Sequence, residues 1–382
     1  MELLRIRGRQ ALPLVQGGMG VGVSAHRLAG SVARAGGVGT ISSVDLRRHH
    51  PDLMRATLRS RDKEAIDAAN LIALDREVRD ARELAAGNGL VAVNVMRAVS
   101  QYPQYVRQAC ASGAEAIVVG AGLALDLPEL TQDWSHVALV PIVSEARAAG
   151  LIARRWLRRG RAPDAIVIEH PRYAGGHLGA ARADEVADAR FDFERVIPET
   201  RGVLHELGID ADRVPLIPAG GINSPQRVAA ALALGAAAVQ VGTPFAVTQE
   251  GDAHPNFKRV LAEARPEDIV VFMSVAGLPA RAVRTPWLAS YLEREAVRQR
   301  RARARRECTL AFDCLTQCGL RDGIARFGQF CIDHHLAAAL RGDVEHGLFF
   351  RGSEALPFAA EIRPVAELFD HLLARVPAEL EA

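Results

Sequence analysis

The feature that most constrains the fold is a regular alternation of short apolar runs with longer segments of helical pattern. Such alternation indicates βαβ units and a parallel sheet. Eight repeats within about 245 residues match a TIM (β/α)8 barrel in number and size, and a doubly wound open sheet is the alternative. The eight strand-like runs are 12–16, 37–41, 90–95, 116–119, 137–143, 165–169, 214–218 and 237–241.

The remaining segments are expected to surround this barrel. We predict an α/β fold in which residues 1–250 form the barrel and 43–88 are a helical insertion in it. Residues 251–382 are predicted to be a helical, cysteine-containing C-terminal segment that packs on the barrel. A chain of 382 residues with 49% hydrophobic residues has enough apolar material for such a core.

Charge and composition exclude several classes of protein. The chain has 47 basic and 45 acidic residues, a balance that is not typical of proteins that bind nucleic acids or anionic membranes. We find no apolar run of the ~18 residues that a membrane span needs, and no secretory signal at the beginning. Five cysteines are too few for a secreted disulfide framework. We therefore expect a cytoplasmic protein that acts on small molecules; a homo-oligomer is left open.

Two glycine turns predict an anion site. The seventh strand runs into PAGGINS at 218–224 and the eighth into QVGT at 240–243. Glycines let backbone N–H groups approach an anion, and TIM barrels often build a phosphate site after strands seven and eight. Amides and glycines at the other strand ends suit a flavin mononucleotide (FMN), while no lysine stands where a Schiff-base aldolase would need one. A phosphosugar isomerase or lyase, with the phosphate on its substrate, is another interpretation.

These strand ends resemble the nitronate monooxygenase (2-nitropropane dioxygenase) family of FMN-dependent TIM-barrel enzymes, to which some flavin-dependent enoyl reductases are similar. The resemblance implies oxidation of alkyl nitronates with O2; the alternative is an NAD(P)H-dependent flavin reductase acting on a quinone or enoyl thioester. A non-catalytic scaffold is a third hypothesis. The matching motifs are LPLVQGGMGVGVS at 12–24, ARAGGVGTIS at 33–42, VAVNVM at 91–96, AGGHLG at 174–179, PAGGINS at 218–224, ALGAAAVQVGTPF at 233–245 and GLPARAV at 277–283.

The resemblance also implies roles for individual residues. His177 matches the active-site histidine of the family, which either takes a proton from a neutral nitroalkane or orients a nitronate. An imidazole titrates near neutral pH, which suits a general base. The HPRY sequence at 170–173 departs from the family pattern, so His170 is either a flavin contact or a turn residue. The residues assigned to the flavin and its phosphate are Gly18, Met19, Asn94, His170, Gly175, Gly176, Gly220, Gly221, Gln240, Gly242 and Thr243.

Four of the five cysteines lie close together in the C-terminal segment. Cys308, Cys314, Cys318 and Cys331 have the spacing C-x5-C-x3-C-x12-C. Thiolates at such separations suit zinc or an iron–sulfur cluster, and the segment is similar to the cluster region of some flavin-dependent dienoyl reductases. Free buried thiols and a disulfide are the alternatives. Cys314 and Cys318 are one helical turn apart, which also fits an apolar helix face.

Overall fold

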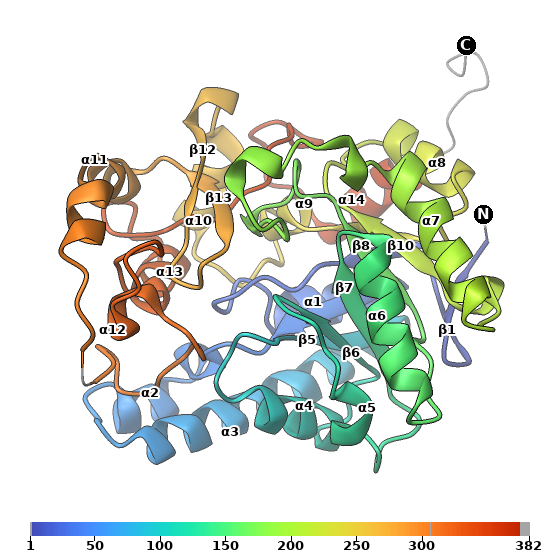
Figure 1. Ribbon diagram of the computed structural model, residues 1–382, viewed down its shortest axis with the longest axis horizontal. Coiled ribbons are helices and arrows are strands. Elements are labelled where there is room, and N and C mark those ends of the chain that lie inside the picture. Colours follow the sequence, from blue (N-terminus) through green and yellow to red (C-terminus); the bar gives the residue numbers. More distant parts are fainter. Residues whose placement is uncertain (1, 306, 375–382) are drawn as a thin grey trace.

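All eight predicted strands are present and close into a parallel barrel, so the predicted TIM-barrel fold is confirmed (Figure 1). The computed structural model describes residues 2–305 and 307–374. Closure is made by β11, which pairs with β3 in the register Val239↔Leu14. In chain order the barrel strands are β3 (Leu14–Gln16), β4 (Val38–Ser42), β5 (Leu90–Met96), β6 (Ala116–Gly120), β7 (Ala138–Val143), β8 (Ile166–Glu169), β10 (Leu216–Ala219) and β11 (Val239–Val241).

Helices cover the outside of the barrel. Two of them begin at residues with clear local causes. Asp62 caps α3 (Lys63–Ala85) by accepting hydrogen bonds from two backbone N–H groups, and Ser224 caps α8 (Pro225–Ala233), which has a proline at its first position. The predicted insertion at 43–88 is helical, with η1 (Leu46–His49) and α2 (Pro51–Thr57) before α3. The other helices around the barrel are α1 (His26–Arg34), α4 (Tyr102–Ala111), α5 (Leu127–Leu130), α6 (Ala146–Leu157) and α7 (Phe193–Glu206).

A short antiparallel hairpin closes the amino end of the barrel. Its strands are β1 (Leu4–Ile6) and β2 (Arg9–Ala11). The hairpin's Leu4 and Ile6 are buried in one apolar cluster with residues at the beginnings of the barrel strands, among them Leu90. Because this end is filled by side chains, a ligand has access to the opposite, carboxyl end.

The C-terminal segment divides into two parts (Figure 1). Helices α11 (Pro286–Arg300), α12 (Gly319–Asp322) and α13 (Ile332–Leu340) lie together at one side of the molecule, whereas α14 (Val365–Leu372) packs beside α8 among the helices that cover the barrel. The segment contains the predicted helices and also an antiparallel hairpin, β12 (Ile269–Met273) and β13 (Pro279–Val283), which the sequence analysis did not predict. The two-residue strand β9 (Gly176–His177) joins β13 in a three-stranded sheet. The other helices are α9 (Thr243–Ala246), which follows β11, and α10 (Pro255–Glu263).

The division of the chain at residue 250 stays a prediction, and residues 375–382 of the predicted segment lie outside the described residues. Within the described ranges, no helix has the length and apolarity that crossing a membrane requires.

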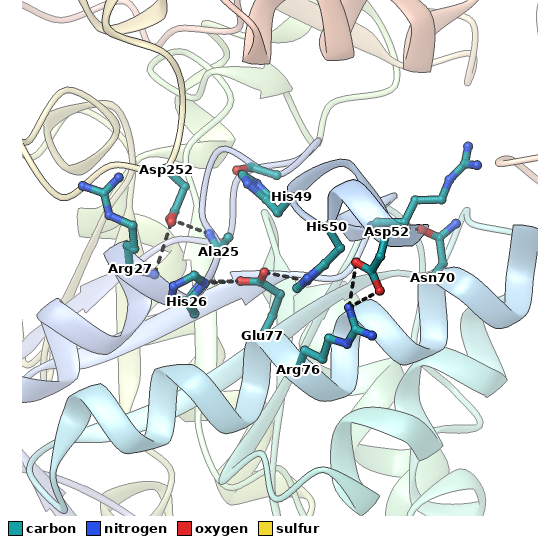
Figure 2. A network of polar contacts seen from close by, with 12 residues as sticks. Ala25, His26, Arg27, His49, His50, Asp52, Asn70, Arg76, Glu77 and Asp252 are labelled. Atoms are coloured by element: carbon teal, nitrogen blue, oxygen red, sulfur yellow. Dashed lines mark hydrogen bonds and ion pairs between the residues drawn. The ribbon is translucent and has the colours of Figure 1, made fainter. Parts of the chain in front are cut away.

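A buried carboxylate fastens the insertion to the barrel (Figure 2). Glu77 of α3 accepts hydrogen bonds from the backbone N–H of His26 at 2.7 Å and is 2.8 Å from its Nδ1; His50 Nε2 is 2.9 Å from the other carboxylate oxygen. Burial alone would raise the pKa of Glu77, but the hydrogen bonds with His26 and His50 hold it well below its usual value. The hydrogen bond to Glu77 in turn raises the pKa of His26. Glu77 therefore stays ionised and links α1, α3 and the loop before α2.

Candidate active site

A cavity of about 600 Å³ lies at the carboxyl ends of the barrel strands, where TIM-barrel enzymes place their chemistry. Its far wall comes from the C-terminal segment, chiefly from Leu315, Ile332, Leu336 and Phe350. Most of the residues that the sequence analysis predicted for the site are brought together here. Those that line the cavity are Gly18, Met19, Asn94, Gly175, Gly176, His177, Gly220, Gly221, Gln240, Gly242 and Thr243.

The two glycine turns lie side by side at one rim. Strands β10 and β11 are neighbours in the barrel, with Ala219 opposite Gln240, so the turns that follow them meet at the same edge. Gly220 and Gly221 have φ angles of +102° and +77°, which L residues with a Cβ rarely adopt. The space that a Cβ would fill at Gly242 is empty. The rim is therefore open at Gly242, whereas Tyr173 packs against the other turn, where a Cβ at Gly221 would lie 2.9 Å from Tyr173 Cγ. Arg227 also donates a hydrogen bond to the carbonyl oxygen of Gly221 and brings a positive charge to this rim.

The floor of the cavity carries two amides. A Cβ added at Gly18 would overlap the Cβ of Asn94 and lie 3.0 Å from its Cγ, so the turn after β3 packs directly on this side chain. Asn94 is 9% exposed and Gln240 8% exposed. Neither amide makes a side-chain hydrogen bond within residues 2–305 and 307–374. Two partly buried amides that face a cavity without protein partners are suited to hydrogen-bond a polar ligand.

His177 reaches the cavity from β9. It pairs with Ala280 of β13, and its Nε2 lies 3.0 Å from the hydroxyl of Ser274. Burial lowers the pKa of His177 to about 4. The imidazole is therefore neutral at pH 7, with Nε2 already engaged by Ser274.

The loop that leads to His177 depends on two further features. A Cβ at Gly175 would come within 2.6 Å of the main chain of Arg351 and Gly352, so only glycine permits this approach. His170 is the exception among the predicted flavin residues, because it does not line the cavity. It is buried, with Nε2 3.2 Å from Asp192 Oδ1 and Nδ1 accepting from the backbone N–H of Arg172. This placement fits the alternative of a turn residue that braces the loop.

The predicted metal site is not assembled. In the described part of the chain, no three His, Cys, Asp or Glu side chains come together in a way that could hold a metal, and the cysteines are free thiols. Burial raises the pKa of Cys314 and Cys318, and raises that of Cys331 to about 12, so these thiols are protonated near neutral pH. Cys314 and Cys318 instead pack against an apolar cluster of the C-terminal segment, and Cys314 lines the cavity. This corresponds to the alternative of free, partly buried thiols.

Two polar residues of this site were not predicted from the sequence. Glu169, the last residue of β8, lines the cavity, and Ser274 contacts His177. The signal for Glu169 was its position at the carboxyl end of a predicted strand. Ser274 carried no such signal, because it follows a strand that was not predicted.

The fold and the site agree with the comparison to protein families: residues 7–375 match the sequence profile of the family described as nitronate monooxygenase. The chain belongs to the nitronate monooxygenase family.

The relatives of this chain are named for different reactions. A probable nitronate monooxygenase of Bacillus subtilis (strain 168) is 31% identical over 140 residues, which are 37% of this chain and 38% of the relative. A 5-hydroxy-7a-methyl-1-oxo-octahydro-1H-indene-4-carboxyl-CoA dehydrogenase of Rhodococcus jostii (strain RHA1) is 25% identical over 277 residues, 72% of this chain and 63% of that protein. The chain thus matches between about a third and two thirds of the length of these relatives.

Solved structures of low sequence identity share the fold. FabK from Thermotoga maritima superposes with a TM-score of 0.66 at 23% identity, covering 94% of this chain and 91% of that one. Nitroalkane oxidase from Streptomyces ansochromogenes gives 0.60 at 18% identity, covering 95% and 94%.

Proposed function

We propose that this nitronate monooxygenase family member is an FMN-dependent enzyme that oxidises alkyl nitronates with O2. The observation that carries the proposal is that one cavity combines the double glycine rim with a half-buried histidine and two amides whose side chains make no hydrogen bond within the described ranges. A phosphate, a polar ring system and a small substrate each have a suitable part of this cavity. The family to which the chain belongs supports the same choice.

The residues fit FMN. The main chain at Gly220, Gly221 and Gly242 would hold the phosphate, since anions bind where glycine turns expose backbone N–H groups. Asn94 and Gln240 offer donors and acceptors for the polar edge of the ring, and the turn at Gly18 leaves room for it. When bound, FMN supplies the electron transfer between nitronate and O2.

The side chains of the protein would position the nitronate. A neutral imidazole at position 177 does not form an ion pair with the substrate, but its Nδ1, when protonated, donates a hydrogen bond to a nitronate oxygen. Ser274 fixes the ring through Nε2. A base whose pKa is about 4 takes up protons weakly at pH 7, so His177 suits a substrate that is already an anion. The apolar wall that includes Leu315 and Phe350 limits the access of water.

The purified protein tests this proposal. We expect a visible flavin spectrum and oxygen consumption when propyl nitronate is added. Anaerobic mixing with NAD(P)H should leave the flavin oxidised. Rapid bleaching by NAD(P)H without any response to propyl nitronate would contradict the proposal and favour a reductase. A colourless protein that does not take up FMN would favour a phosphosugar enzyme.

The reductase is the second candidate because of the far wall of the cavity. This wall is apolar over several residues and exceeds what a short alkyl chain needs, so it suits the acyl group of an enoyl thioester or the ring of a quinone. The Rhodococcus relative is named for a carboxyl-CoA substrate. Comparing crotonyl-CoA and a benzoquinone with propyl nitronate under one assay separates the two functions.

A further inference from the structure

We propose that Glu169 is a further catalytic residue, which takes the α-proton from a neutral nitroalkane and so produces the nitronate inside the site. This inference rests on the proposed function, because it supplies the anion that the oxidation consumes. It assigns proton transfer to the carboxylate and leaves orientation of the substrate to His177.

The position of Glu169 carries the first part of the argument. Glu169 ends β8 and lines the same cavity as His177. The loop that contains His177 passes over it: a Cβ built at Gly179 would lie 3.6 Å from Glu169 Oε2 and 2.5 Å from the hydroxyl oxygen of Ser144. The carboxylate thus lies between the end of β7 and the residues that directly follow His177. Glu169 and His177 therefore face one cavity, and a substrate bound there has access to both side chains.

The availability of the carboxylate is the second part. No hydrogen bond or ion pair to the side chain of Glu169 is found among residues 2–305 and 307–374. His177, by contrast, has its Nε2 engaged by Ser274. Other acidic groups near the site are already paired: Glu354 with Arg227 at 2.8 Å, and Asp333 with Arg48 at 2.5 Å. Of the acidic side chains that line the cavity in the described ranges, Glu169 is the one without a cation partner.

Electrostatics agree with the geometry. Burial raises the pKa of Glu169 to about 7, and no charged neighbour contributes to this shift. Burial also lowers the pKa of His177 to about 4. The usual order of basicity between carboxylate and imidazole is therefore reversed in this cavity, and at pH 7 the carboxylate accepts a proton more readily. Pairs of groups with pKa values shifted apart commonly divide acid–base work in this way.

The proposed step conserves atoms and electrons. The α C–H bond of the nitroalkane breaks, its electron pair moves into the nitro group to give the nitronate anion, and the proton goes to a carboxylate oxygen of Glu169. No oxidation occurs in this step. The proton leaves Glu169 to solvent through the partly exposed side of the residue before the next turnover.

The first experiment measures proton transfer without oxidation. Under anaerobic conditions in D2O, NMR follows the exchange of the α-hydrogen of nitroethane catalysed by the purified flavoprotein. We expect Glu169→Gln to slow this exchange on the order of 100-fold, the lower part of the usual range for a general base. Glu206→Gln is the matched control, since Glu206 is exposed at the end of α7. Equal exchange rates in wild type and Glu169→Gln would overturn the inference.

The second experiment compares two substrates. The ratio of turnover with nitroethane to turnover with ethyl nitronate should fall at least tenfold in Glu169→Gln, whereas His177→Asn should lower both rates. An unchanged ratio in Glu169→Gln contradicts the inference. If wild type oxidises neither substrate, the proposed function fails, while the exchange measurement still decides the role of Glu169.

A third measurement concerns the carboxyl group itself. Infrared difference spectra of the purified wild-type protein between pH 5 and pH 9 should contain a protonated-carboxyl band that titrates near pH 7 and is missing from Glu169→Gln. A wild type that lacks such a band has an ordinary, ionised carboxylate here, and the inference is then wrong. Circular dichroism should confirm that Glu169→Gln and His177→Asn are folded.

Discussion

Gly18→Ala is the substitution that tests the floor of the cavity most directly. The added Cβ would overlap Asn94 Cβ, lie 3.0 Å from Asn94 Cγ and 3.4 Å from Thr40 Cγ2. Carbon atoms pack best at about 3.5–4.0 Å, so the Asn94 side chain or the turn at 17–20 must move. Overpacking of this kind costs roughly 1–3 kcal/mol. Because the displaced groups face the predicted flavin, we expect the cost to weaken FMN binding.

This cost corresponds to FMN binding that is roughly 5- to 150-fold weaker, since about 1.4 kcal/mol is a factor of ten. Apoprotein titrated with FMN, followed by quenching of flavin fluorescence, measures the change. Gly202→Ala is the matched control, because a Cβ at this position in α7 meets nothing within 4 Å. FMN affinity of Gly18→Ala within twofold of wild type would refute the reasoning about the cavity floor.

Three further predictions concern the hydrogen bonds of Glu77, the contact between Ser274 and His177, and the C-terminal cysteines. Glu77→Gln should lower the free energy of unfolding at pH 6 by roughly 2–3 kcal/mol in urea titrations, as charge-assisted hydrogen bonds are lost, while the exposed Glu83→Gln should change it by less than about 0.5 kcal/mol. Because the pKa of Glu77 is lowered in the folded protein, its contribution to stability is present above the usual carboxyl pKa and is lost as the pH falls below about 4. Plots of unfolding free energy against pH for wild type and Glu77→Gln should therefore converge at low pH, and parallel plots would contradict this. Ser274→Ala removes one hydrogen bond from His177 and should reduce nitronate turnover roughly 2- to 10-fold, and unchanged steady-state rates would argue against positioning by Ser274. Anaerobically purified protein should contain neither iron nor zinc in stoichiometric amount by elemental analysis, and one metal per chain would restore the predicted cysteine site.

The barrel and the meeting of its glycine turns at one edge were predictable because their signals are local. Each strand is a short apolar run, and closing eight such strands in order fixes which strand ends are neighbours. The turns at 220–221 and 242–243 lie far apart in sequence from the turn at 17–20, yet barrel closure puts all three around one cavity. The glycines at these positions are evident in the sequence, and the barrel topology explains why they lie around one cavity.

The hairpin of β12 and β13 was not predictable in the same way. Residues 269–273 are an apolar run inside a segment of helical pattern, and periodicity alone does not separate a short strand from a buried helical turn. What stabilises this hairpin is its pairing with β9, about a hundred residues earlier, where Ala280 meets His177. The contact between Ser274 and His177 is equally non-local. The cysteine spacing left metal ligands and free thiols open for a related reason, since spacing in an irregular segment does not determine where side chains point.

The reversal of basicity in the cavity also explains why the sequence alone points to His177 as the base, whereas we assign this role to Glu169. An isolated imidazole is more basic than a carboxylate by about two pKa units, so a histidine in a family motif is the natural choice. Burial opposes the charged form of each group, and the charged forms have opposite signs: it lowers the pKa of His177 and raises that of Glu169. Neither group has an ion pair within the described ranges to counter this effect. The same cavity wall that excludes water from the substrate therefore moves the proton-accepting role from the imidazole to the carboxylate.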